Sequence, residues 1–473
     1  MRCLTVFSAL AIFAVAPHRP TQAQEPHAYG PQIDEIMSVY EQDGSPGVVV
    51  AVVRDGQIEF AKGYGMANLE HGLPMTRETA SDLGSVSKQF TGFAIALLAQ
   101  QGKLSLDDDI RTHLPEIPDL GATVTIWHLI HHMSGLREIY NSLQIAGWQS
   151  GDRIAQEDAL RLMARQRELN FSPGSEYLYC NTAYMLLAEI VGRVGGRPFP
   201  EWMRVNVFDP LGMSHTTIMA EFGQVIPKVA TSYSRSDGTF RQIYDNSTVQ
   251  GAGGVYSTVD DMAKWIGNFG NPVVGDAQTI EQIQQRGVLT NGDTLSYAFG
   301  ITVGDFRGLH RLQHTGSSAG YRAWLAYFPE VGIGIVTLSN FADFDRRAQN
   351  EILEAVLGDR LAPAATDNGD QENPDPPKAA QPFIMTPEEL QAYAGMYYSP
   401  ELETVYTFSV EDGRLMASHR RYDPFEVALI TRDEFDGPSF VDTIEFERDS
   451  SGNVIGMRIS NGRVRNLWFE KLE

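Results

Sequence analysis

Cysteine is almost absent from this chain, which holds only Cys3 and Cys180 among its 473 residues. Two thiols cannot build a disulfide framework or a four-thiolate zinc site, so the fold must be stabilised by its core. Basic residues are also few, with 37 Lys and Arg against 60 Asp and Glu, and the formal net charge is -23. An acidic chain repels phosphate backbones, and we therefore expect no nucleic-acid partner.

Long hydrophobic runs are lacking too, except for one at residues 4–16. This run follows the basic Arg2 and precedes a proline-containing break and a small-residue site at Ala23. The order is typical of a secretory signal peptide, whereas a spanning helix needs roughly 20 apolar residues. We predict that residues 1–23 are a signal peptide cleaved near Ala23. The protein would then be periplasmic or secreted, without a permanent membrane anchor.

The length of the chain exceeds that of an ordinary single domain. A hairpin turn signal at Asp55-Gly56 separates two strand-like runs, and two more runs stand about 270 residues later. These four runs are residues 48–53, 58–64, 321–328 and 333–338. Helical spacing fills the region between them. We predict an α+β domain over residues 24–360, with an antiparallel sheet that is flanked by helices and shared by both ends of the domain.

Residues 361–382 differ from the rest of the chain, because they are rich in proline and acidic residues and have almost no large apolar side chains. This composition predicts a linker. From residue 383 to residue 473 short alternating runs are separated by turn signals such as Asp412-Gly413 and Asn461-Gly462. The spacing favours a small all-β barrel or sandwich as a C-terminal domain.

The strongest local signal is Gly84-Ser85-Val86-Ser87-Lys88, which is followed by apolar residues at helical spacing. Residues three apart share one face of a helix, so Ser85 and Lys88 are expected side by side near a helix start. A serine hydroxyl needs a base to become a nucleophile, and a desolvated lysine can be that base. Ser-x-x-Lys is common, and by itself it also fits a helix cap beside a solvated lysine.

Two further motifs follow in order, Tyr179-Cys180-Asn181 and His314-Thr315-Gly316. Taken singly, each is more typical of a helix start or a strand end. Together with Ser-x-x-Lys, this order resembles the serine β-lactamase-related family, which includes class C β-lactamases, S12-type DD-carboxypeptidases, D-aminopeptidases and family VIII esterases. Segments such as PGVVVAVVRDG and TIWHLIHHMSGL support the resemblance over roughly residues 30–357. It implies a β-lactamase/transpeptidase-like domain followed by a lipocalin-like barrel.

The resemblance implies that Ser85, Lys88 and Tyr179 are the catalytic residues. Ser85 would attack a carbonyl carbon and become acylated. The positive charge of Lys88 would favour the phenolate of Tyr179, which could then act as a general base for attack and deacylation.

The resemblance also implies four substrate-binding residues. Asn181 would orient Lys88 and a substrate amide, and His314 would bond to the Tyr179 oxygen. Gly316 would leave room for substrate backbone, and the amide of Ser317 would complete an oxyanion hole with the amide of Ser85.

These roles lead us to expect an exported serine hydrolase that forms an acyl-enzyme on a small-molecule or peptide substrate, without a metal or an organic cofactor. His128, His131 and His132 fall at helical spacing, but no carboxylate accompanies them, so we predict no metal site. His-Thr-Gly in place of Lys-Thr-Gly favours a D-stereospecific peptidase or amidase of the DD-carboxypeptidase or D-aminopeptidase type.

Other functions fit the same residues. A carboxylesterase or a weak β-lactamase would use the same site. The alternative from another class is a slow-turnover sensor that binds penicillin or cell-wall peptides. The sequence gives no prediction of the oligomeric state.

Overall fold

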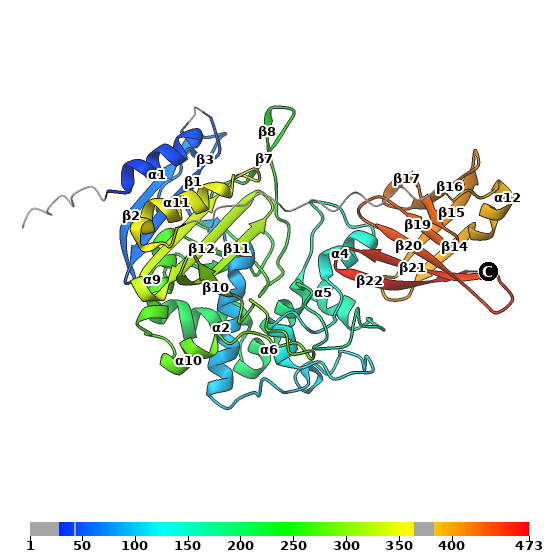
Figure 1. Cartoon of the computed structure of the whole chain (residues 1–473), viewed down its shortest axis with the longest axis horizontal. Coiled ribbons are helices and arrows are strands. Elements are labelled where there is room, and N and C mark those ends of the chain that lie inside the picture. The colour runs from blue at the N-terminus through cyan, green and yellow to red at the C-terminus, as the bar shows by residue number, and fades with distance from the viewer. Residues whose placement is uncertain (1–27, 42–43, 364–382, 473) are drawn as a thin grey trace, which may run out of the picture.

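The computed structural model describes residues 28–41, 44–363 and 383–472. The predicted signal peptide lies outside these residues, as does most of the predicted linker. The described chain forms a larger part of mixed helices and strands, which ends at residue 363, and a smaller all-β part from residue 383 (Figure 1). The exact domain boundaries stay predictions.

A six-stranded antiparallel sheet organises the larger part, with the strand order β10-β11-β12-β13-β1-β2. The two ends of this part meet in the middle of the sheet, where Val50 of β1 lies opposite Thr337 of β13. The prediction that both ends share one antiparallel sheet is confirmed. The strands are β1 (Val48–Arg54), β2 (Gln57–Tyr64), β10 (Thr302–Phe306), β11 (Leu309–Ser318), β12 (Tyr321–Phe328) and β13 (Ile333–Ser339).

Helices cover both faces of this sheet. Helices α1 (Gly30–Met37) and α11 (Arg347–Leu357) cover one face, where they pack against Val50 of β1. Helix α9 (Val259–Gly270) lies on the other face, with Ile266 packed in the same apolar cluster as Val49. Neighbouring strand residues point to opposite faces, so the continuous apolar run of β1 fills both cores.

The labelled ones among the remaining helices of the larger part lie below the large sheet or between it and the barrel in the view of Figure 1. Helices α2 (Lys88–Gln100) and α6 (Asn181–Gly195) pack against each other, and most of their residues are buried. The shorter helices are α3 (Ile126–Ile130), α4 (Ile139–Ile145), α5 (Gln156–Met163), α7 (Phe199–Met203), α8 (Asp209–Leu211) and α10 (Ala277–Gln282). Short strands complete this part: β3 (Met66–Asn68), β4 (Leu73–Pro74), β5 (Ser81–Asp82), β6 (Thr217–Ile218), β7 (Tyr233–Ser236), β8 (Thr239–Gln242) and β9 (Val255–Ser257).

The smaller part is one nine-stranded antiparallel sheet with the order β17-β16-β15-β14-β22-β21-β20-β19-β18. Its two edge strands, β17 and β18, follow one another in the chain with only Val427 between them, so the sheet is nearly closed into the predicted barrel. The elements are α12 (Pro387–Leu390), β14 (Gly395–Ser399), β15 (Thr404–Glu411), β16 (Arg414–His419), β17 (Tyr422–Glu426), β18 (Ala428–Thr431), β19 (Glu434–Asp436), β20 (Thr443–Arg448), β21 (Val454–Asn461) and β22 (Val464–Lys471).

The barrel docks beside α4 and α5 of the larger part (Figure 1). The hydroxyl of Tyr406 in β15 donates to the carbonyl oxygen of Ile145 in α4 at 2.8 Å. One apolar cluster contains buried residues of both parts, which include Leu143, Ile145 and Tyr406. The two parts are therefore joined by a packed interface as well as by the chain.

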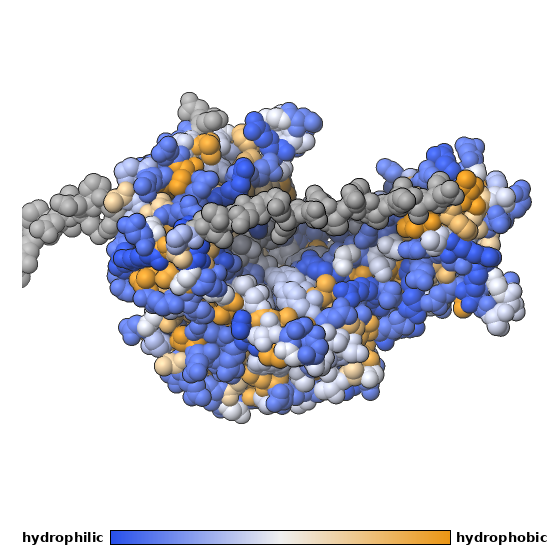
Figure 2. Space-filling view, in the orientation of Figure 1, coloured by the Kyte–Doolittle hydropathy of each residue, from blue (hydrophilic) through white to orange (hydrophobic). Residues whose placement is uncertain are grey.

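The outer surface is mixed in character. Figure 2 shows hydrophilic residues interspersed with smaller apolar groups over this face of both parts. Within the ranges that the structure describes, no helix combines the length and the apolar composition needed to cross a bilayer.

Candidate functional site

Ser85 lies in a 3-10 turn, Gly84–Ser87, between β5 and α2. The sequence predicts a helix start near Ser85, and the α-helix itself begins at Lys88. Gly84 has a φ of +49°, and a Cβ on it would lie 2.6 Å from the backbone nitrogen of Ser317 in β11. Glycine meets both demands, the left-handed backbone and the close approach. The turn thereby brings Ser85 against the end of β11.

Lys88 is fully buried beside Ser85. Its Nζ lies 3.1 Å from the Ser85 Oγ, and it donates to Oδ1 of Asn181 and to the carbonyl oxygen of Ala252, both at 2.8 Å. Burial lowers the pKa of Lys88 to about 7, although the nearby carboxylate of Glu138 acts in the opposite direction. A lysine with this pKa is partly neutral at neutral pH and can accept a proton from Ser85.

Tyr179 completes the trio, but its charge state differs from the prediction. The Nζ of Lys88 lies over the face of the Tyr179 ring, 4.8 Å from its centre. The phenol hydroxyl is buried and makes no hydrogen bond of good geometry within the described residues. Burial raises the pKa of Tyr179, and the nearby Ser85 hydroxyl and Arg463 only partly oppose this. The resting phenol is therefore neutral, because its desolvation outweighs the neighbouring positive charges.

His314 makes different contacts from those predicted. Its Nδ1 lies 2.6 Å from the carbonyl oxygen of Thr315, to which it donates, and its Nε2 accepts from the hydroxyl of Tyr297 at 3.0 Å. Both ring nitrogens are thus engaged, and neither bonds to the Tyr179 oxygen. Burial first, and then the charge of Lys88, lower the pKa of His314 to about 3. The ring is neutral and carries its proton on Nδ1.

Gly316 and Ser317 form the end of β11 that faces the Ser85 turn. A Cβ on Gly316 would lie 2.0 Å from the carbonyl oxygen of Leu83. The space beside Gly316, which we expected to hold substrate backbone, is therefore filled by the backbone of Leu83. The glycine is needed for packing of the turn against the strand. Ser317 lines the cavity described below, and its hydroxyl accepts from Nη2 of Arg346 at 2.7 Å.

Asn181 is the first residue of α6 and links Lys88 to a buried carboxylate. Its Oδ1 accepts from Lys88, and its Nδ2 donates to Oε1 of Glu138 at 2.7 Å. Glu138 is fully buried, and its other oxygen, Oε2, accepts from the backbone nitrogen of Asn141 at the start of α4. Asn181 thus occupies the predicted position, and Glu138 is an addition that the motifs do not contain.

A cavity of about 470 Å³ opens in front of Ser85. Asp82 and Asp245 lie in its wall, where Asp82 accepts from the backbone nitrogen of Gly84 and Asp245 accepts from the hydroxyl of Ser318. Burial raises the pKa of Asp82, and the nearby Asp245 adds to this. Residues that line the cavity include Ser85, Tyr140, Asp152, Tyr179, Asn181, Tyr256, Ser317 and Arg463.

Arg463 comes from the turn between β21 and β22 of the C-terminal barrel. Its Nη1 donates to the carbonyl oxygen of Tyr179 at 3.3 Å, and its guanidinium lies 5.6 Å from the centre of the Tyr179 ring. Asn170 of the larger part holds this turn, because its Nδ2 donates to the carbonyl oxygen of Arg463 at 3.0 Å and its Oδ1 accepts from the backbone nitrogen of Arg465 at 2.9 Å. The barrel therefore contributes Arg463 to the lining of the cavity.

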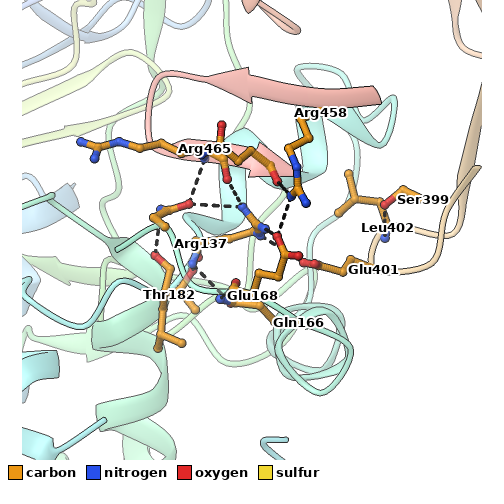
Figure 3. Close-up of polar contacts among 12 residues, drawn as sticks. Arg137, Gln166, Glu168, Thr182, Ser399, Glu401, Leu402, Arg458 and Arg465 are labelled. Atoms are coloured by element: carbon orange, nitrogen blue, oxygen red, sulfur yellow. Dashed lines mark hydrogen bonds and ion pairs between the residues drawn. The ribbon is translucent and has the colours of Figure 1, made fainter. Parts of the chain in front are cut away.

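A buried ion pair anchors the barrel close to the site (Figure 3). The Nε of Arg137 donates to Oε2 of Glu401 at 3.1 Å, and its Nη1 donates to the carbonyl oxygen of Arg465. Arg458 adds an ion pair with Glu168 at 2.7 Å. Arg137 directly precedes Glu138, so a single loop holds both the barrel and the carboxylate that contacts Asn181.

The three histidines of the predicted helix face have ring nitrogens that face backbone groups. In His131, Nδ1 lies 3.0 Å from the carbonyl oxygen of Trp127, and Nε2 lies 2.9 Å from the carbonyl oxygen of Gln285. His132 accepts at Nδ1 from the backbone nitrogen of Cys180. Across the described ranges, no group of His, Cys, Asp or Glu is arranged to hold a metal ion.

The contributors to the site that the sequence motifs lack include Glu138, Tyr297 and Arg463. Glu138 lies in the segment after Ser-Gly-Leu, Tyr297 lies between a helix and a strand, and Arg463 follows the Asn-Gly turn signal. The turn signal predicts the hairpin of Arg463 but not its position beside Tyr179. No local pattern marks the other two.

Comparisons with known proteins show the family of the larger part of the chain. The Beta-lactamase family model matches residues 32–358, which is more than half of the chain. A D-aminopeptidase of Gluconobacter oxydans (strain 621H) is 28% identical over 315 residues, which cover 66% of this chain and 59% of the relative. Penicillin-binding protein 4* of Bacillus subtilis (strain 168) is 26% identical over 326 residues and covers 66% of this chain and 71% of its own length. The chain spans about three fifths of the D-aminopeptidases that it matches.

Solved structures share the architecture. The octameric penicillin-binding protein homologue from Pyrococcus abyssi superposes with a TM-score of 0.61 at 23% identity and covers 93% of this chain and 98% of that chain. EstCE1, described as a hydrolase with promiscuous acyltransferase activity, has a TM-score of 0.60 at 25% identity and covers 70% of this chain and 99% of its own. The first likeness extends over both the larger part and the barrel.

Proposed function

The chain belongs to the Beta-lactamase family, and we propose that it is a serine hydrolase acting as a D-stereospecific peptidase or amidase through an acyl-enzyme on Ser85. The observation that carries the proposal is the contact of the Ser85 hydroxyl with a buried lysine whose pKa is lowered to about 7. The similarity to D-aminopeptidases and to penicillin-binding proteins supports the choice of substrate class.

Acylation begins with proton transfer from Ser85 to neutral Lys88. The Ser85 oxygen then attacks the carbonyl carbon, and the amides of Ser85 and Ser317 stabilise the negative charge on the carbonyl oxygen. Tyr179 gives its phenol proton to the leaving nitrogen as the carbon–nitrogen bond breaks. The acyl group is now on Ser85, Lys88 is an ammonium and Tyr179 is a phenolate.

Deacylation restores these groups. The Tyr179 phenolate takes a proton from water, and the hydroxide attacks the acyl carbon. The bond to Ser85 breaks, and the Ser85 oxygen takes back its proton from Lys88. Tyr179 thus acts as an acid in the first half and as a base in the second, which agrees with the neutral phenol of the resting site.

Arg463 supports a peptide substrate over a simple ester. Within the described residues it forms no ion pair with a carboxylate, and it lines the cavity in front of Ser85. A guanidinium in this place can bind the free carboxylate of a peptide by charge-assisted hydrogen bonds. Esters without a carboxylate would leave it unused.

An esterase is the second candidate. The likeness to EstCE1 at 25% identity favours it, because the same nucleophile and base would cleave an ester. The leaving alcohol would then need less help from Tyr179 than a leaving amine does.

A substrate panel tests the proposal. The values of kcat/KM are measured for D-Ala-D-Ala peptides, D-amino-acid amides, short p-nitrophenyl esters and nitrocefin, with Ser85→Ala as the control. We expect the D-configured peptides or amides to rank first and their L-epimers to be far slower. A ranking led by esters supports the esterase, and a ranking led by nitrocefin contradicts the peptidase.

Export is part of the same proposal. We propose that residues 1–23 are removed as a signal peptide and that the enzyme acts on peptides outside the cytoplasm. N-terminal sequencing of the protein from the periplasm or medium should begin near Gln24. A chain that retains Met1 in the cytoplasm would contradict this part.

A further inference from the structure

Glu138 is a buried carboxylate next to the site that the mechanism above does not use. It is fully buried at the N-terminus of α4, where Oε2 accepts from the backbone nitrogen of Asn141 at 3.0 Å. Its other oxygen, Oε1, accepts from Nδ2 of Asn181 at 2.7 Å. No Lys or Arg of the described residues forms an ion pair with it. Burial of a carboxylate charge without an ion-pair partner costs free energy, so we expect Glu138 to have a function in the site.

The contact with Glu138 determines which way the Asn181 amide points. A carboxylate can only accept hydrogen bonds, so the side of the Asn181 amide that faces it must be the NH2 group. The opposite side, which faces Lys88, must then be the carbonyl oxygen. A flipped amide would set a donor against the lysine and an oxygen against the carboxylate.

The orientation of Asn181 in turn decides where the lone pair of Lys88 points. Two neighbours of Nζ, the Asn181 Oδ1 and the Ala252 carbonyl oxygen, can only accept. Neutral lysine has two N–H groups, and both are used by these acceptors. The lone pair is left to face the third neighbour, the Ser85 Oγ at 3.1 Å. This is the arrangement that a base toward Ser85 requires.

We propose that Glu138 is a positioning residue that fixes the Asn181 amide and so directs the lone pair of Lys88 at Ser85. The inference rests on the proposed role of Lys88 as the base. Glu138 does not line the cavity. It acts on Lys88 in two ways, through its hydrogen bond with Asn181 and through its negative charge.

The charge of Glu138 supports the same role. Burial lowers the pKa of Lys88, and Glu138 is the largest influence that opposes this. Its negative charge therefore stabilises the ammonium that forms when Lys88 takes the Ser85 proton. The other titratable groups that face Lys88 are Arg463, Cys180, His132, His314, Tyr179 and Tyr184.

The test compares Glu138→Gln and Glu138→Ala with the full-length wild type. The measured quantity is the second-order rate at which a fluorescent fluorophosphonate labels the protein, from pH 5.5 to pH 9.5. This reagent phosphonylates an activated serine, with fluoride as the leaving group, whatever the natural substrate is. Asp261→Asn is the matched control, because Asp261 is also fully buried but contacts His215, Thr216 and Lys264, which lie outside the cavity lining.

For wild type we expect the rate to rise with pH around pH 7, as Lys88 loses its proton. Glu138→Gln removes the charge that holds the proton on Lys88, so the midpoint should fall by about one pH unit. The plateau should also drop about tenfold, and Glu138→Ala should lower it about 100-fold, within the range of general-base effects. Asp261→Asn should keep the wild-type midpoint even where it lowers the melting temperature.

The result that overturns the proposal is a Glu138→Gln variant with the midpoint and plateau of wild type. Should Glu138→Ala fail to fold, Glu138→Gln alone decides, since the midpoint shift is not expected from a purely structural role. Ser85→Ala separates this outcome from failure of the proposed function. If Ser85→Ala labels as fast as wild type, the nucleophile is wrong, whatever Glu138 does.

Discussion

The guanidinium of Arg463 lies 5.6 Å from the centre of the Tyr179 ring and donates to the Tyr179 carbonyl oxygen at 3.3 Å. The two residues are 284 positions apart. Arg463 belongs to the barrel, and Tyr179 is the first residue of the Tyr-x-Asn motif that leads into α6. The C-terminal domain therefore contributes a residue to the lining of the cavity in front of Ser85.

Arg463→Ala should weaken the binding of D-peptides that end in a free carboxylate. A hydrogen bond to a charged group contributes about 1.5–3 kcal/mol, so KM should rise about 10- to 100-fold. The same peptide with an amidated C-terminus should lose little. Steady-state kinetics on the two peptides check this, with Arg414→Ala as the control, because Arg414 is an exposed barrel residue paired with Glu426. Equal losses on both peptides would show that Arg463 does not bind the carboxylate.

The ion pair of Arg137 with Glu401 should be essential for docking of the barrel. Both side chains are almost fully buried, and removal of Glu401 leaves the buried Arg137 guanidinium with the half-exposed Glu168, at 3.9 Å, as its remaining ion-pair partner among the described residues. Glu401→Leu should therefore destabilise the protein by about 3–5 kcal/mol. Denaturant unfolding measures the loss. The double variant Arg137→Met with Glu401→Leu should recover most of it, and a double variant no more stable than the single one would contradict the account.

Lys88→Met should be inactive yet more stable than wild type at neutral pH. The folded protein holds Lys88 at a pKa of about 7, and the unfolded chain holds it near 10.5. Between these values the unfolded state binds one more proton, so wild-type stability rises with pH over this window. The variant lacks this dependence, and its advantage, about 4 kcal/mol at pH 7 from the shift between these two values, should shrink toward pH 10. Unfolding curves at pH 7 and pH 9.5 check the sign.

Gly316→Ala should disrupt the site through packing. The added methyl group would lie 2.0 Å from the Leu83 carbonyl oxygen, so the Ser85 turn or β11 must move. We expect a loss of about 3 kcal/mol and a loss of labelling at Ser85. Gly304→Ala is the matched control in the adjacent strand β10, because a Cβ there has no neighbour within 4 Å. Similar stability for the two variants would refute the packing role of Gly316.

Much of the fold follows from local patterns. The β-branched run of β1, the Asp55-Gly56 turn and the helical spacing after Ser85 predict elements that the structure contains. The predicted relationship to serine β-lactamase-related proteins is confirmed by the family match. These features depend on neighbours within a few residues, which a sequence displays directly.

The finer contacts of the site depend on tertiary packing, and there the sequence was a poorer guide. His314 does not form the predicted hydrogen bond with the Tyr179 oxygen. Its Nε2 accepts a hydrogen bond from the hydroxyl of Tyr297 instead. The predicted phenolate is a neutral phenol, because burial outweighs the charge of Lys88. Glu138 belongs to no motif, and its importance emerges only when α4 and α6 meet.

The central claim is that Ser85 is acylated by a D-peptide during turnover. The most direct measurement is mass spectrometry of the intact and proteolysed enzyme after rapid acid quenching of a reaction with a D-Ala-D-Ala peptide. The account predicts an acyl group on the peptide that contains Ser85, none with the L-epimer and none in Ser85→Ala. Turnover of the D-peptide with an acyl group on another residue, or unchanged turnover by Ser85→Ala, would contradict it.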